Sequence, residues 1–160
     1  GHFREAALAA AVKRRRLGRC VALDGDAESL HEVERCYARY SVEPALFRVR
    51  QLLAGKAALG KFDLIYSLGL FDYLTQPVGQ RLVRVLFQML RPAGRLVVAN
   101  FLPGIRDVGY MESFMDWLLI YRNRQEIMDL TIEIPQCELR EVTLFAEENQ
   151  NILFLDVRRN

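Results

Sequence analysis

Short apolar runs alternate with amphipathic stretches along most of the chain, and this alternation predicts its secondary structure. The apolar runs at 20–24, 45–50, 62–67 and 95–101 are short and rich in Val, Ile, Leu and Phe, which is typical of buried strands. The stretches between them repeat apolar residues every three or four positions, as helices do. Strands that alternate with helices predict an α/β fold whose mostly parallel sheet has helices on both faces.

Helix boundaries follow from caps and from helix-breaking residues. Asp26 is expected to cap one helix, and Pro77 lies at the first or second position of another. Pro44 is expected to break the chain before the strand at 45–50, and Gly18 to end the first helix. The predicted helices cover 1–16, 26–40, 76–90, 110–121 and 124–130.

The C-terminal segments 138–148 and 151–159 alternate in polarity around Asn149 and Gln150, which predicts a hairpin. This antiparallel hairpin is expected to extend the parallel sheet. No internal repeat, low-complexity tract or domain boundary is apparent, so residues 1–160 are interpreted as a single domain.

Composition narrows the function classes. The chain has 160 residues, of which 51% are hydrophobic and 26% charged, and its net charge of +2 favours neither nucleic acid nor membrane binding. The basic run 13–16 suits the end of a helix, although an anion or partner site stays open there. No apolar run approaches the roughly 20 residues that a membrane span needs, so no stable membrane insertion is expected.

The three cysteines, Cys20, Cys36 and Cys137, have no metal-like spacing, and no metal site is predicted. Their positions in strand-like and helix-like runs favour buried free thiols, which suit a reducing cytoplasm.

Polar and small residues follow several of the predicted strands. In an open parallel sheet the carboxyl ends of the strands form the ligand-binding edge. Asp24 there could accept bonds from both hydroxyls of a ribose, or it could only cap a helix. Gly69 would let the backbone approach a ligand closely, or it could only make a turn. The strand-end residues are Asp24, Arg48, Val49, Gln51, Ser67, Leu68, Gly69, Asp72, Tyr73, Asn100 and Phe101.

These features together resemble the class I S-adenosylmethionine-dependent methyltransferases, which have a Rossmann-like fold. The resemblance rests on the element order, on "ALDGDAESL", "FDLIYSLGLFDYL" and "LRPAGRLVVANF", and on the closing hairpin. It covers essentially the whole chain. The stretches "YSLGLFDYL", "GRLVVANFLPG" and "GYMESFMDWLLIYR" are similar to bacterial methyltransferases of 3-hydroxypalmitic acid methyl ester biosynthesis.

The resemblance implies S-adenosylmethionine as cofactor and assigns a part of it to each strand end. Asp24 would hold the ribose, Gly25 would border the adenine, and Val49 with Arg48 or Arg50 would flank the base. The start of the chain and the strand end at 67–69 would face the methionine and the sulfonium. The implied cofactor residues are Gly1, His2, Asp24, Gly25, Val49, Arg50, Ser67, Leu68 and Gly69.

The acceptor implied by the resemblance is a small molecule, and one candidate is the carboxylate of a hydroxy fatty acid. Asp72 and Tyr73 would orient it. A carboxylate is already nucleophilic, so no general base is required. The aromatic residues at 110–121 could be core, an apolar pocket wall or an oligomer face. The implied acceptor-facing residues are Asn100, Phe101, Phe114 and Trp117.

One departure from the family pattern concerns the first strand and most of the glycine-rich loop, which are expected upstream of Gly1. The chain is therefore interpreted as a fragment that lacks the first strand. Whether it binds the cofactor by itself stays open.

Two other functions compete. A short-chain nicotinamide-dependent reductase needs Lys four residues after a Tyr, and no tyrosine here has one. The second alternative is a methyltransferase-like domain without activity, kept for interaction. His31 lies on a predicted helix face and is not expected to be catalytic.

Overall fold

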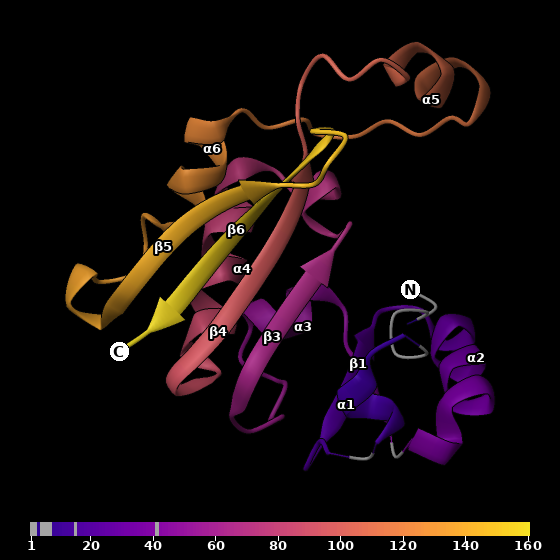
Figure 1. The fold of residues 1–160 in the computed structure, drawn as a ribbon, viewed down its shortest axis with the longest axis vertical. Helices are drawn as coiled ribbons and strands as arrows, with labels where there is room; N and C mark the ends of the chain where they lie inside the picture. The colour runs from indigo at the N-terminus through magenta and orange to yellow at the C-terminus, as the bar shows by residue number, and fades with distance from the viewer. Residues whose placement is uncertain (1–2, 4–7, 15, 41) are drawn as a thin grey trace. The chain divides into compact units, whose positions relative to one another are not determined.

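The computed structural model describes residues 3, 8–14, 16–40 and 42–160, which divide into two compact units (Figure 1). The first unit is Gly1–Ala58 and the second is Leu59–Asn160. The single domain expected from the sequence stays a prediction.

The first unit contains a two-stranded parallel sheet. Strand β1 (Cys20–Asp24) pairs along its whole length with β2 (Val42–Leu46). Helix α2 (Ala27–Tyr37) covers the sheet, because apolar residues of both elements form one buried cluster. The cluster consists of Ala22, Leu30, Val33 and Val42. The remaining elements of this unit are α1 (Ala10–Lys13), η2 (Ala38–Tyr40) and α3 (Val49–Leu53).

The predicted cap of α2 is confirmed. The Asp26 carboxylate accepts bonds from the Glu28 amide at 3.2 Å, and from the amide and hydroxyl of Ser29 at 3.0 and 2.7 Å. These bonds satisfy amides that the first turn of a helix leaves without partners. A carboxylate here is also favourable to the helix dipole.

The prediction around Pro44 is wrong. Pro44 lies inside β2, opposite Ala22, and the strand ends at Leu46 instead of continuing to residue 50. A proline is tolerated because β2 has only one neighbouring strand among the described residues. Residues 49 and 50 begin α3. The first helix also differs, since its described part begins only at Ala10.

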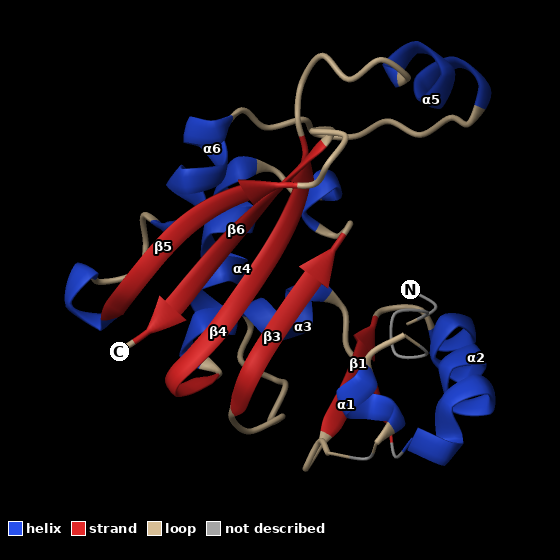
Figure 2. Ribbon diagram, in the orientation of Figure 1, coloured by secondary structure: helices blue, strands red, loops and turns tan. Residues whose placement is uncertain are grey.

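The second unit is built on a four-stranded sheet. Its strands are β3 (Phe62–Leu68), β4 (Leu90–Phe101), β5 (Leu139–Ala146) and β6 (Ile152–Arg159), in the order β3-β4-β6-β5 (Figure 2). β3 and β4 are parallel, whereas β6 runs antiparallel to both of its neighbours. The α/β class with a C-terminal antiparallel hairpin is therefore confirmed.

Helices α4 (Gln76–Gln88) and α6 (Arg124–Met128) lie on one face of this sheet, whereas α5 (Val108–Phe114) extends beyond the end of β4 (Figure 2). Apolar residues of α4 and of the central strands are fully buried and form the core. They include Leu82, Val83, Phe87, Leu96, Leu153 and Leu155. Short helical turns complete the unit: η3 (Phe71–Tyr73), η4 (Asp129–Thr131) and η5 (Gln136–Glu138).

The predicted helix at 110–121 is only partly right. Helix α5 begins at Val108 and ends at Phe114, and Asp116 has a positive φ of 49°. That conformation interrupts a right-handed helix. The Trp117 amide then bonds back to the Met111 carbonyl at 2.9 Å, and later residues bond to other segments.

Two predictions about burial are also wrong. Leu64 and Tyr66 were expected in a buried strand, yet they are 52% and 38% exposed. The reason is that β3 is an edge strand in the described part of the chain. All three cysteines are free as predicted, but Cys36 and Cys137 are exposed rather than buried. No helix in the described ranges is long and apolar enough to cross a bilayer.

Candidate functional site

A buried polar cluster lies at the carboxyl end of β3 and β4 in the second unit. It consists of Asp72, Asn100 and Arg122, which are 2%, 1% and 1% exposed. We call these three residues the clamp. Ionisable side chains are rarely this buried unless other groups bond to them, so the partners of each explain why the site exists.

Asp72 bonds to two segments that are distant in sequence. Its Oδ1 atom accepts a hydrogen bond from the Phe101 amide at 2.8 Å, and its main-chain carbonyl accepts one from the Ile120 amide at 2.7 Å. The turn after β3 is thereby fixed both to the end of β4 and to the chain before Arg122.

The Asn100 side chain joins the same segments from β4. Its Nδ2 donates to the carbonyls of Phe101 and Ile120, at 3.0 and 2.9 Å. Its Oδ1 accepts a bond from Arg122. Both ends of this amide are thus used inside the protein.

The guanidinium of Arg122 is the most connected group of the clamp. Its Nε donates to Gln76 Oε1 and its Nη1 to the Phe71 carbonyl, both at 2.7 Å. Its Nη2 donates to the Leu74 carbonyl. Together with the bond to Asn100, these contacts secure the turn that connects β3 to α4. Arginine suits this position because its planar fork offers five donors in fixed directions.

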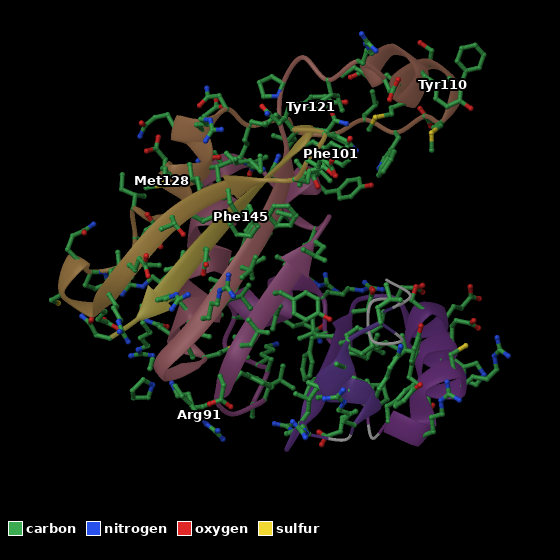
Figure 3. All side chains as sticks on the ribbon, in the orientation of Figure 1. Arg91, Phe101, Tyr110, Tyr121, Met128 and Phe145 are labelled. Atoms are coloured by element: carbon green, nitrogen blue, oxygen red, sulfur yellow. The ribbon has the colours of Figure 1, made fainter. Side chains whose placement is uncertain are left out.

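The clamp lies where the two ends of a long segment meet. This segment, residues 102–121, is called the arm. The Arg122 amide donates to the Phe101 carbonyl at 3.1 Å, so the two ends of the arm are joined. Figure 3 shows Phe101 and Tyr121 where these ends meet and Tyr110 on α5 at the outer part of the arm. The arm thus starts from a rigid and buried point.

Burial changes the acidity of both charged clamp residues. Desolvation raises the pKa of Asp72, although the Phe101 amide and the charge of Arg122 act in the opposite direction. Desolvation likewise lowers the pKa of Arg122, against the attraction of Asp72 and Glu126. In both residues burial disfavours the charged form and dominates.

Beside the clamp lies a partly exposed group of aromatic residues. The Trp117 indole contacts Phe101 edge-to-face, with ring centroids 5.9 Å apart, and its N–H donates to the Tyr73 hydroxyl. Phe114 does not belong to this group. It is 80% exposed and stacks on Tyr110 of α5, with centroids 5.4 Å apart.

The backbone is open at Gly69, just after the end of β3. Gly69 has a φ of +104°, a conformation that favours glycine, and a β-carbon there would meet no atom within 4 Å. Ser67 is half-buried, and Leu68 is 55% exposed. These three residues therefore border open space within the second unit.

A cavity of about 470 Å³ lies within the first unit. A β-carbon at Gly25 would lie 3.3 Å from Arg48 Cγ, so glycine there lets the turn after β1 approach Arg48. Asp24 directly precedes Gly25 in sequence but is not among the lining residues of this cavity. Its carboxylate accepts a bond from the Asp26 amide at 3.0 Å. The cavity is lined by Gly25, Asp26, Ala27, Leu46, Arg48, Arg50 and Gln51.

The structure therefore gathers the sequence-predicted residues into separate groups. Gly25 and Arg50 line one cavity in the first unit, without Asp24 or Val49 among its lining residues. In the second unit, Tyr73 and Phe101 both contact Trp117. Asp72 and Asn100 both bond to the main chain of Phe101 and Ile120. Gly1 and His2 lie outside the described residues. Convergence of Asp24 with Gly69 stays a prediction, since they belong to different units.

Sequence reasoning missed Arg122. The available signal was a lone cation after the apolar run 117–121, because a charge in such a position needs bonded partners if the run is buried. Its partners lie 22 to 51 positions away, so no local pattern could identify them.

Replacing Arg122 by Met tests the clamp. The substitution keeps apolar volume but removes the Arg122 donor from the side-chain oxygens of Asn100 and Gln76 and from the Leu74 carbonyl. A buried unpaired group costs about 1–3 kcal/mol. We expect the free energy of unfolding in urea to fall by about 3–5 kcal/mol. The control Arg81→Met, at an exposed position of α4, should change it by less than about 0.5 kcal/mol. Equal small losses in both variants would contradict the clamp.

The raised pKa of Asp72 predicts a pH dependence of stability. The folded state holds the Asp72 proton more tightly than the unfolded chain does, so this contribution is complete below about pH 4. It is lost as the pH rises through the folded pKa. We expect the free energy of unfolding, relative to Asp72→Asn, to decrease from pH 4 to pH 7. Urea titrations at each pH measure this difference, and an increase relative to Asp72→Asn would refute the sign.

Solved structures share this fold. A possible exported protein from Bordetella parapertussis superposes with a TM-score of 0.69 at 17% identity, over 88% of this chain and 53% of its own. NodS, an N-methyltransferase from Bradyrhizobium japonicum solved with S-adenosyl-L-homocysteine, gives 0.61 at 16%, over 91% and 71%. SMU.1697c from Streptococcus mutans, solved with the same ligand, gives 0.59 at 14%, over 94% and 81%.

At such identities the structural likeness shows the fold alone, and the chain spans about half the length of the Bordetella protein. No curated protein matches the sequence. A family model described as "Methyltransferase domain" matches residues 4–98, which is more than half of the 160 residues. The chain therefore belongs to the methyltransferase domain family.

Proposed function

We propose that this protein transfers a methyl group from S-adenosylmethionine to a small-molecule acceptor. The observation that carries the proposal is the family match, because residues 4–98 include both the acid turn at 24–26 and the strand end at 67–69. NodS and SMU.1697c were both solved with S-adenosyl-L-homocysteine, the product that remains after such a transfer.

The proposed cofactor residues fall in both units. In the first unit, Asp24 would hold the ribose, while Gly25 and Arg50 border the cavity where the adenine would lie. Val49, next to Arg50, would flank the base. In the second unit, the open strand end at 67–69 would face the methionine and the sulfonium. Its support is the lack of any atom within 4 Å of a β-carbon at Gly69.

When bound, the cofactor would supply an electrophilic methyl group, and the protein would only need to hold the acceptor in line with it. Asp72 is 2% exposed and bonded to the Phe101 amide, so we assign it a positioning role rather than a general-base role. Tyr73 is 55% exposed, and its hydroxyl, which accepts the bond from Trp117, still has its own proton to donate to an acceptor. Asn100 would hold the clamp in place and would not touch the acceptor. Phe101 and Trp117 would offer the acceptor an apolar contact.

For the acceptor we propose the carboxylate of a hydroxy fatty acid, as in 3-hydroxypalmitic acid methyl ester biosynthesis. Support comes from the arm, whose large apolar side chains face solvent. Several large exposed apolar side chains on one short segment indicate a ligand or partner site, and two of these, Tyr110 and Phe114, stack on each other. The exposed residues are Tyr110, Phe114, Met115 and Leu118. A second copy of the chain is the other candidate to cover them, and a bacterial, cytoplasmic setting belongs to the same proposal.

Calorimetric titration tests the proposal against a nicotinamide-dependent reductase and against a domain without activity. We expect S-adenosylmethionine to bind and NADH not to bind. Asp24→Ala should weaken binding by about ten- to hundredfold, the effect of losing hydrogen bonds to a charged group. The control Glu34→Ala, at an exposed position on α2, should bind like the wild type.

Binding of NADH instead would favour the reductase. Binding of neither cofactor would favour the non-catalytic domain and would overturn the proposal.

A further inference from the structure

A groove of about 620 Å³ lies entirely within the second unit, at the root of the arm. Three segments form it: the loop after β4, the start of α6 and the turn between β5 and β6. It lies at the carboxyl edge of β3 and β4, since the loop continues directly from β4. Its lining residues are Leu102, Pro103, Gly104, Ile105, Arg106, Asn123, Arg124, Gln125, Asn149, Gln150 and Asn151.

The charge of this groove is one-sided. Arg106 and Arg124 line it, and no Asp or Glu is among its lining residues. Neither guanidinium has an ion pair or a hydrogen bond within the described chain. Two cations without partners at one concave surface favour an anion.

Arginines without a bonded partner are the minority among the described residues of the second unit. Its sequence contains ten arginines, and six of them form an ion pair with a carboxylate or donate to a side-chain amide or a carbonyl. Only four lack such a partner among the described residues, and the groove holds two of the four. The other two are Arg81 and Arg140, at exposed positions of α4 and β5.

Four carboxylates lie within two residues of the lining in sequence, and none of them lines the groove. Asp107 and Glu148 are exposed, whereas Glu126 and Glu147 accept bonds from main-chain amides. Glu126 accepts a bond from the Asn123 amide at 2.8 Å, which caps α6. Glu147 accepts one from the Asn151 amide at 3.1 Å, which holds the hairpin turn. Both carboxylates therefore stabilise the walls of the groove and are not among the residues that line it.

The walls are also preformed. The Leu102 amide donates to the Asn151 carbonyl at 2.8 Å and fastens the loop after β4 to the hairpin. The Asn123 side chain accepts from the Glu126 amide at 2.9 Å, so the start of α6 is fixed as well. Little chain entropy would be lost when a ligand binds to such walls.

We propose that this groove binds the anionic group, a carboxylate or a phosphate, of a small molecule. Arg106 and Arg124 provide charge-assisted hydrogen bonds, which are strongest toward these planar or tetrahedral oxyanions. Side-chain amides at Asn149 and Asn151 provide neutral donors and acceptors for the rest of the molecule.

The site does not depend on methyl transfer. The anion bound here is distinct from the carboxylate that would receive the methyl group. A carboxylic acid is one source of it, and a phosphorylated metabolite is the other. Binding can be measured without S-adenosylmethionine, so failure of this site and failure of the proposed function are separate results.

Titrations followed by amide NMR shifts test the site on the 160-residue chain, with 3-hydroxydecanoate and inorganic phosphate as the two probes. We expect at least one probe to shift the amides of 102–106, 123–125 and 149–151. The methyl ester of 3-hydroxydecanoate should bind at least tenfold more weakly than the acid. Affinity should also fall as salt is raised, because the interaction is between charges near the surface.

The double variant Arg106→Gln/Arg124→Gln should lose at least tenfold in affinity. The matched double variant Arg81→Gln/Arg140→Gln removes the same charge elsewhere in this unit and should bind like the wild type. Binding of the fatty acid alone would identify a carboxylate ligand, and binding of phosphate alone a phosphate ligand. Binding of neither probe, or equal losses in the two double variants, would overturn the proposal.

Discussion

The second unit depends most on the hydrogen bonds of the buried Arg122 guanidinium. The guanidinium joins the turn after β3, the end of β4 and the start of α4 through bonds to Phe71, Leu74, Gln76 and Asn100. Burying such a group is expensive without partners and tolerable with them. Asn100 and Arg122 satisfy each other in a region closed to solvent, so removing either one leaves the other without its partner.

This arrangement separates a rigid base from an exposed arm. Bonds from Asp72 and Asn100 hold the arm at Phe101 and Ile120, while α5 beyond them exposes apolar side chains such as Phe114. The groove with Arg106 and Arg124 begins at the same root. Apolar surface and unpartnered cations thus lie along one short stretch of chain, and the clamp fixes where that stretch starts.

Local patterns in the sequence predicted the strands, the Asp26 cap and the hairpin, because each follows from the spacing or the chemistry of neighbouring residues. They failed where distant segments decide. The sequence could not reveal that Pro44 would sit in a strand with one neighbour, nor that Asp116 would end the helix of the arm. Asp72 and Asn100 were correctly placed at strand ends, but only the fold reveals that they are buried.

Amide hydrogen exchange tests the clamp most directly, because it reports on individual backbone bonds. The Ile120 and Arg122 amides lie outside any strand, yet they donate to Asp72 and Phe101. If the clamp organises the second unit, both should exchange as slowly as amides of the central strands, while the amides of α5 exchange much faster. Exchange of Ile120 and Arg122 at the rate of α5 would contradict the account.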